Sequence, residues 1–116
     1  PTDERHRLDP VALERSLAAC TDLGLRPMAI VATAGTTDFG AIDPLPAIAD
    51  LARAYDAWFH VDAAYGGGLL VSPTRRDRLA GIDRADSVTV DYHKTFFQPV
   101  SSSAIIAWPA LRANPL

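Results

Sequence analysis

The sequence predicts an α/β fold: a mostly parallel β-sheet with helical crossovers and one antiparallel strand. Short apolar runs alternate along the chain with amphipathic stretches at helical spacing, and turn residues separate them. A strand–helix–strand order implies right-handed crossovers and makes consecutive strands parallel. With 116 residues, of which 48 % are apolar and 22 % charged, the chain is long enough for one domain with a buried core.

Two helices are predicted from capping signals and apolar periodicity. Asp9, followed by a proline, is typical of a helix start, and apolar residues recur at helical spacing until Gly24. These signals predict a helix over residues 10–23. Asp43, again followed by a proline, precedes an apolar stripe that predicts a second helix over residues 44–55.

Four strands and one further short helix complete the expected order. Continuous, partly β-branched apolar runs are typical of strands that are covered on both faces. Ser72 and Pro73 open a short helical pattern that ends near Gly81. Only thirteen residues, with no helical pattern, separate the last two strands, which favours an antiparallel return there. The strands are expected at residues 28–33, 57–61, 87–90 and 104–108.

The charge balance argues against a nucleic-acid partner. Eleven basic and fourteen acidic residues give a net charge of −3, and the cluster of Arg75, Arg76 and Arg78 is typical of a solvated helix face. The single cysteine, Cys20, excludes a disulfide within the chain. The sequence contains no signal peptide and no apolar run of membrane-spanning length, so we expect a cytoplasmic protein without a membrane partner.

The two ends of the chain suggest a piece of a longer protein. The sequence opens on Pro1 without an initiator methionine, and it stops a few residues after an apolar run. We therefore expect residues 1–116 to be part of a larger domain, with flanking parts outside this sequence.

Polar side chains collect where the predicted strands end. Thr36 follows the first strand, Asp62 the second, and His93 and Lys94 the third. In open parallel sheets, ligands bind beyond the carboxyl ends of the strands. Because neighbouring strands lie about 4.8 Å apart, we expect Asp62 and Lys94 to face each other across a gap that fits a flat ring.

A lysine beside a carboxylate suits a carbonyl cofactor such as pyridoxal phosphate. An unprotonated lysine amine forms an imine with a carbonyl group. The pyridine ring of this cofactor withdraws electrons only while its nitrogen is protonated, and an adjacent carboxylate such as Asp62 favours the protonated form. Small residues would let a planar ring lie close to the backbone, and several follow Asp62: Ala63, Ala64 and the glycines at 66–68.

A non-haem iron site is the alternative from another class. His60, Asp62 and the distant His93 also match the two-histidine, one-carboxylate triad of iron oxygenases. Those oxygenases carry the triad on an all-β fold, whereas the helical stripes here favour crossovers, and the triad leaves Lys94 without a role. We therefore predict no metal at this position.

Three motifs resemble the group II pyridoxal-phosphate-dependent amino acid decarboxylases. They are "VATAGTTDFGAID" at 31–43, "HVDAAYGGG" at 60–68 and "DSVTVDYHKTFFQPVSSSA" at 86–104. The resemblance implies part of the large domain of an aminotransferase-like fold, fold type I, over residues 1–116. It also implies pyridoxal 5′-phosphate as cofactor, an amino acid as substrate and a homodimer as the normal assembly. The phosphate-binding loop, the residue that stacks on the other ring face and the small C-terminal domain are expected outside this chain, so the chain by itself is expected to be inactive.

The same resemblance assigns roles to individual residues. By motif position, Lys94 is the lysine that forms the imine and Asp62 is the partner of the pyridine nitrogen. Ala64 is expected to pack on one face of the ring. The remaining expected cofactor-site residues are His60, Thr36, His93 and Asp91.

One position departs from the better-known members of the family. Aromatic and glutamate decarboxylases have Asn-Pro-His-Lys at the lysine, whereas this chain has Asp91, Tyr92, His93 and Lys94. The family's asparagine lies near the cofactor phosphate, so Asp91 puts that contact in doubt. The pattern is similar to bacterial decarboxylases of lysine, ornithine or 2,4-diaminobutyrate, which predicts a basic diamino acid as substrate. The alternatives are an aromatic or glutamate decarboxylase, a carbon–carbon lyase of the sphingosine-phosphate type, and an inactive fragment.

Overall fold

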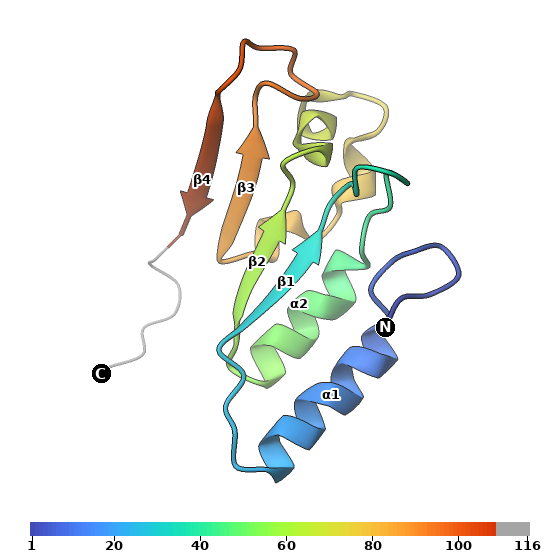
Figure 1. Ribbon diagram of the computed structural model, residues 1–116, viewed down its shortest axis with the longest axis vertical. Coiled ribbons are helices and arrows are strands. Elements are labelled where there is room, and N and C mark those ends of the chain that lie inside the picture. Colours follow the sequence, from blue (N-terminus) through green and yellow to red (C-terminus); the bar gives the residue numbers. More distant parts are fainter. Residues whose placement is uncertain (109–116) are drawn as a thin grey trace.

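A four-stranded β-sheet organises the chain, with both α-helices on one of its faces (Figure 1). This computed structural model describes residues 1–108. The strand order is β1-β2-β3-β4; β1, β2 and β3 are parallel, and β4 is antiparallel to β3. The predicted sheet is confirmed, and each strand lies within one residue of its expected bounds. The strands are β1 (Ala29–Thr33), β2 (Trp58–Asp62), β3 (Ser87–Asp91) and β4 (Ser103–Ala107).

The first helix, α1 (Pro10–Asp22), begins and ends as its capping residues predict. The side chain of Asp9 accepts a hydrogen bond from the amide of Val11 at 2.9 Å, which satisfies one amide of the first turn. Gly24 follows the helix with φ of 72°, a conformation that glycine adopts without steric cost. The second helix, α2 (Leu45–Ala54), is also where the apolar stripe predicts it.

Asp43 does not cap α2, contrary to the expectation from its position before a proline. The residue at the cap of α2 is Pro44, and no side chain caps that helix. The carboxylate of Asp43 is buried and accepts hydrogen bonds from the amides of Leu8 and Thr33, each at 2.7 Å. These partners lie on the N-terminal segment and at the end of β1, so Asp43 ties two distant segments together.

The third predicted helix is wrong as a single element. Between Ser72 and Gly81 the structure has only the short 3₁₀ helix η2 (Arg76–Leu79). Two further 3₁₀ helices flank this range: η1 (Gly66–Val71) before it and η3 (Ile82–Arg84) after it. Within η2 only Leu79 is buried, so the segment has no apolar stripe to stabilise a longer α-helix. Gly81 lies between η2 and η3 with φ of 92°, a left-handed conformation that ends the helical backbone there.

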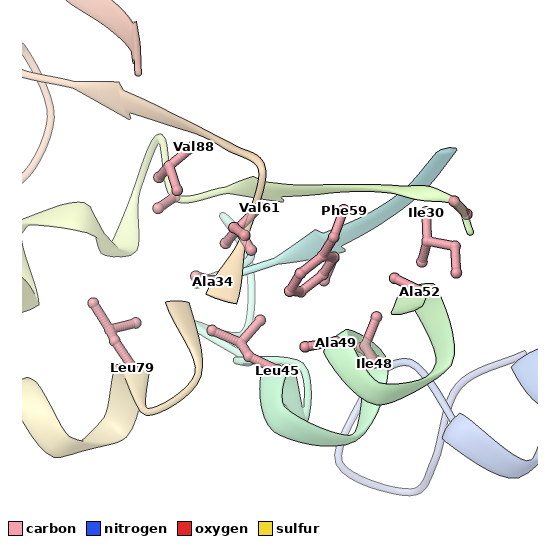
Figure 2. Packing of buried hydrophobic residues seen from close by; sticks show 14 of the residues in the cluster. Ile30, Ala34, Leu45, Ile48, Ala49, Ala52, Phe59, Val61, Leu79 and Val88 are labelled. Atoms are coloured by element: carbon pink, nitrogen blue, oxygen red, sulfur yellow. The ribbon is translucent and has the colours of Figure 1, made fainter. Parts of the chain in front are cut away.

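The hydrophobic core lies between α2 and the sheet (Figure 2). Phe59 and Val61 of β2 point toward α2, beside Ile30 of β1. Burying a side chain as large as Phe59 stabilises a fold by roughly 1.5–3 kcal/mol. The helix contributes one face to this core, made of Leu45, Ile48, Ala49 and Ala52.

The opposite face of the sheet carries the alternate residues of each strand. Along β2, Phe59 and Val61 are buried under the helix, while Trp58, His60 and Asp62 point to the other side. In the part of the chain that the structure describes, no helix is long and apolar enough to cross a membrane.

Candidate active site

Asp62 ends β2 with a half-buried carboxylate. Its Oδ1 accepts a hydrogen bond from the amide of Ala64 at 3.0 Å, which fixes the orientation of the carboxylate. Its backbone carbonyl accepts the amide of Ala34 at 2.8 Å, which joins the end of β2 to the chain leaving β1. Among residues 1–108, no lysine, arginine or histidine forms an ion pair with Asp62.

His60 lies on the same face as Asp62, and both of its ring nitrogens have partners on β3. Nδ1 is 2.7 Å from Oγ of Ser87, and Nε2 is 3.1 Å from Oγ1 of Thr89. The indole N–H of Trp58 donates to the same Ser87 hydroxyl at 2.8 Å. Because an indole only donates, the proton of Ser87 is free to go to Nδ1 of His60, and Nε2–H then points to Thr89. Of the two tautomers, this network favours the one in which Nε2 of His60 carries the proton.

Lys94 lies in the turn after β3 and forms an ion pair with Asp91. Its Nζ is 2.8 Å from Oδ2 of Asp91, and Nε2 of His93 is 3.8 Å from the same oxygen. Hydrogen bonds from Lys94, first, and from the Ser103 hydroxyl, second, hold the pKa of the Asp91 carboxyl below its ordinary value. The charges of Lys94 and His93 lower this pKa further, while partial burial acts in the opposite direction. Asp91 is thus a carboxylate at neutral pH.

His93 is tied to the start of β4. Its Nδ1 is 3.0 Å from the carbonyl of Ser102 and 3.3 Å from the amide of the same residue. The amide of Tyr92 also donates to the Ser102 carbonyl, at 2.8 Å. The histidine therefore holds the two sides of the β3–β4 connection together.

Thr36 closes the loop after β1. Its Oγ1 accepts the amide of Ala41 at 3.0 Å, and its own amide donates to the carbonyl of Ala41 at 3.0 Å. The chain at Ala34 touches the glycine-rich segment after β2, where the amide of Gly66 donates to the Ala34 carbonyl at 3.0 Å. A Cβ at Gly66 would lie 2.1 Å from that carbonyl oxygen, so only glycine permits this approach.

The glycine-rich segment also contacts the turn that carries Lys94. The amide of Gly68 donates to Oγ1 of Thr95 at 3.1 Å, and this hydroxyl donates to the carbonyl of Tyr65 at 2.8 Å. The loops after β1, β2 and β3 are therefore brought together at one end of the sheet, as the sequence predicts. Each contributes residues expected at the cofactor site.

The sequence analysis missed three residues of this region: Ser87, Thr89 and Ser103. The alternation of β3 places Ser87 and Thr89 on the same face as Asp91, so a pattern of every second residue could have found them. Which residues of β2 and β4 they contact depends on the strand register, which the sequence pattern does not specify. His60↔Ser87 and Asp91↔Ser103 are both register pairs.

The iron alternative does not fit this arrangement. The iron oxygenases carry their triad on an all-β fold, whereas the sheet of this chain is mostly parallel with helical crossovers. Both ring nitrogens of His60 already bond to hydroxyl groups, and His93 faces Ser102 and Asp91. Over residues 1–108, no group of three His, Cys, Asp or Glu side chains is arranged to hold a metal ion.

A sequence model of the pyridoxal-dependent decarboxylase conserved domain matches residues 1–109. The chain belongs to the pyridoxal-dependent decarboxylase family. This match covers nearly the whole sequence and confirms both the resemblance carried by the three motifs and the predicted cofactor, pyridoxal phosphate.

Two curated members of the family share much of this sequence. The chain is 53 % identical over 104 residues to an L-2,4-diaminobutyrate decarboxylase of Rhizobium meliloti, which covers 90 % of the chain. It is 44 % identical over 106 residues to an L-2,4-diaminobutyrate decarboxylase of Acinetobacter baumannii, which covers 91 % of it. In both comparisons the chain spans only 21 % of the relative's length.

Solved structures of the family confirm the predicted fold class. Mouse CSAD in apo form matches with a TM-score of 0.89 and 46 % identity, over 91 % of this chain and 22 % of that one. The glutamate decarboxylase domain of diaminobutyrate-pyruvate transaminase and L-2,4-diaminobutyrate decarboxylase from Vibrio parahaemolyticus matches with a TM-score of 0.88 and 46 % identity, over 91 % and 23 %. Oryza sativa TDC with PLP matches with a TM-score of 0.84 and 38 % identity, over 89 % and 22 %.

The residues gathered at this end of the decarboxylase sheet fit pyridoxal phosphate chemically. Lys94 supplies an amine whose side chain is 36 % exposed, and Asp62 supplies a carboxylate held by the Ala64 amide. These are the two groups that the carbonyl and the ring nitrogen of the cofactor need. Ala64 and the glycine-rich segment add small side chains beside Asp62.

Proposed function

We propose that the whole protein is a pyridoxal-phosphate-dependent decarboxylase of a basic diamino acid, with 2,4-diaminobutyrate ahead of ornithine and lysine. The observation that carries this proposal is the placement of Asp62 and Lys94 at the same end of neighbouring parallel strands in a chain of this family. The names of the relatives from Rhizobium meliloti and Acinetobacter baumannii support the choice of substrate. We further propose that residues 1–116 are part of the large domain of a cytoplasmic homodimer.

Each proposed site residue has a separate task. When bound, pyridoxal phosphate supplies the electron sink for the carbon from which carbon dioxide leaves. Lys94 attaches the cofactor through Nζ, which must first lose a proton. Asp62 favours a proton on the ring nitrogen by Coulombic attraction, and the Ala64 amide holds its carboxylate in place.

The other proposed residues shape the site around these two. His60 is fixed in one orientation by Ser87 and Thr89, so it presents a rigid polar surface next to Asp62. Ala64 and Thr36 belong to loops that meet at this end of the sheet, and His93 steadies the turn that carries Lys94. Holding reacting groups in place is itself a large part of catalysis.

The test uses the full-length protein, loaded with pyridoxal phosphate and supplied in parallel with 2,4-diaminobutyrate, ornithine, lysine, glutamate and tyrosine. We expect carbon dioxide release with the highest kcat/KM for 2,4-diaminobutyrate. Borohydride treatment should fix the cofactor to the peptide that contains Lys94. Release confined to tyrosine, or covalent attachment to another lysine, would contradict the proposal.

A further inference from the structure

Asp91 has an enclosed carboxylate with three polar or charged neighbours. Its side chain is only 14 % exposed, and Oδ2 lies 2.8 Å from Nζ of Lys94. The Ser103 hydroxyl bonds to it from β4, and His93 approaches the same oxygen at 3.8 Å. These contacts come from the turn and from the neighbouring strand, so they hold the carboxylate from two sides.

We propose that Asp91 is a positioning residue for Lys94: its carboxylate holds the Lys94 ammonium by an ion pair whenever that nitrogen is not bonded to a carbonyl carbon, and it does not bind the side-chain ammonium of the substrate. This inference rests on the proposed function in one respect, because it takes Lys94 as the lysine that attaches the cofactor.

The local geometry keeps Asp91 and Lys94 together. They are separated by one turn of chain, in which the amide of Lys94 donates to the carbonyl of Asp91 at 3.4 Å. Asp91 is the last residue of β3 and stands in register with Ser103 of β4, which fixes its backbone. The ion pair is therefore formed between two groups whose backbone positions are already set.

The same geometry disfavours a substrate ammonium at Asp91. Whenever the Lys94 nitrogen is not bonded to a carbonyl carbon, a second cation at this carboxylate would lie beside the Lys94 ammonium, and two like charges at contact distance repel each other. The oxygen that Lys94 occupies is also the oxygen that faces His93. A side-chain ammonium of the substrate would have to displace one partner and approach the other.

A carboxylate at this position has a consequence that an amide would not have. A carboxylate and an amide can each accept a hydrogen bond from Lys94, but only the carboxylate carries a negative charge that stabilises the Lys94 ammonium. Because the amine must lose a proton before it attacks a carbonyl carbon, the ion pair with Asp91 and the attack are competing states of Lys94.

The charge of Asp91 stays constant over the pH range in which the ion pair can be tested. The lowered pKa of Asp91 means that its charge is present at neutral pH and is lost only as the pH falls below the ordinary carboxyl range. Besides Lys94, the groups that face the Asp91 carboxylate are His93 from the turn and Ser103 from β4. Asp62 ends the neighbouring strand β2. Measurements above pH 7 therefore report the lysine against a constant carboxylate.

The experiment compares full-length wild-type protein with Asp91→Asn, which keeps the shape and removes the charge. Cofactor-free protein is mixed with pyridoxal phosphate between pH 6 and 10 without substrate, and loading is followed by visible absorption and by borohydride trapping. For a partly exposed pair, we expect the pH of half-maximal loading rate to fall by about half a unit to one unit in Asp91→Asn. Asp91→Glu, which keeps the charge, should lie closer to wild type.

Steady-state kinetics separate the two possible partners of Asp91. With 2,4-diaminobutyrate and with 2-aminobutyrate, which lacks the side-chain ammonium, Asp91→Asn should change kcat by the same factor and leave KM within about twofold. Asp77→Asn is the matched control for net charge, because Asp77 is exposed on η2, and it should leave the loading pH unchanged.

Three outcomes would overturn the inference. The first is a KM for 2,4-diaminobutyrate that rises tenfold or more in Asp91→Asn while 2-aminobutyrate is unaffected. The second is an unchanged loading pH, and the third is an equal shift in Asp91→Glu and Asp91→Asn. The loading comparison needs only the cofactor and Lys94, so wild-type protein that loads normally but releases no carbon dioxide would contradict the proposed function alone.

Discussion

The two faces of the sheet differ in what they contribute. The face toward α2 presents Phe59, Val61 and Ile30, all buried and apolar (Figure 2). The other face presents His60 and Asp62, with Ser87, Thr89 and Asp91 beside them on β3. Because successive side chains of a strand point to opposite faces, the two sets are interleaved in the same few residues of sequence.

Alternate residues of the same strand therefore contribute either to stability or to the proposed site. The covered face gains free energy by removing apolar area from water. The polar face holds its groups by hydrogen bonds between register partners, such as His60 with Ser87, and carries the Asp62 carboxylate that we propose as the partner of the ring nitrogen. Substitutions one residue apart on β2 should therefore have different kinds of effect.

Asp62→Asn should have the largest effect and should act on chemistry alone. Without the carboxylate, the ring nitrogen loses its charge partner, and a loss of a few pKa units corresponds to a fall in kcat of roughly a hundredfold to ten-thousandfold. The amide oxygen of Asn can still accept the Ala64 amide, so the melting temperature of the full-length protein should change little. Loading of the cofactor on Lys94 should persist at saturating concentration. Near-normal decarboxylation by Asp62→Asn would mean that Asp62 has only a structural role at the end of β2.

Phe59→Ala should have the opposite signature. Phe59 is 1 % exposed in the core, and truncating such a side chain costs about 3–5 kcal/mol, from lost burial and from the cavity left behind. Urea unfolding of the full-length protein should show this loss. The protein that remains folded should keep its KM, because Phe59 points away from the polar face. A cost below about 1 kcal/mol, or a large change in KM, would break the proposed division between the faces.

Ser87→Ala tests a residue that contributes both to stability and to the polar face. Its effect should be the smallest of the three. Ser87 belongs to the polar face by alternation, yet it is 6 % exposed and bonds to both Trp58 and His60. Trp58 is 38 % exposed and His60 is half-buried, so losing the Ser87 hydroxyl costs about 0.5–1.5 kcal/mol, as for an ordinary hydrogen bond. We expect a loss of stability in that range together with a severalfold loss of kcat.

The tautomer of His60 distinguishes this effect from simple destabilisation. Nitrogen chemical shifts of the imidazole should show Nε2–H in the wild type and a mixture of tautomers in Ser87→Ala. Ser87→Thr, which keeps the hydroxyl, is the matched control and should preserve the wild-type signal. Unchanged imidazole shifts in Ser87→Ala would mean that Ser87 does not orient His60.

Much of the site could be predicted from sequence because it depends on where strands end. Asp62 and Lys94 follow apolar runs that are strands in the structure, and parallel strands bring their carboxyl ends together. Thr36, Ala64 and His93 lie in loops at that end for the same reason. Their roles toward the cofactor remain predictions that the experiments above address.

The sequence by itself determined the features that depend on local pattern: the mostly parallel sheet, the start of α1 at Asp9 and its end before Gly24. Only the tertiary structure decided which partner each polar side chain takes. Asp43 bonds to Leu8 and Thr33 instead of capping α2, because those amides are brought to it from distant segments. Ser87 meets His60 across 27 residues of sequence for the same reason. Such pairs depend on strand register and on the packing of loops, which no local spacing specifies.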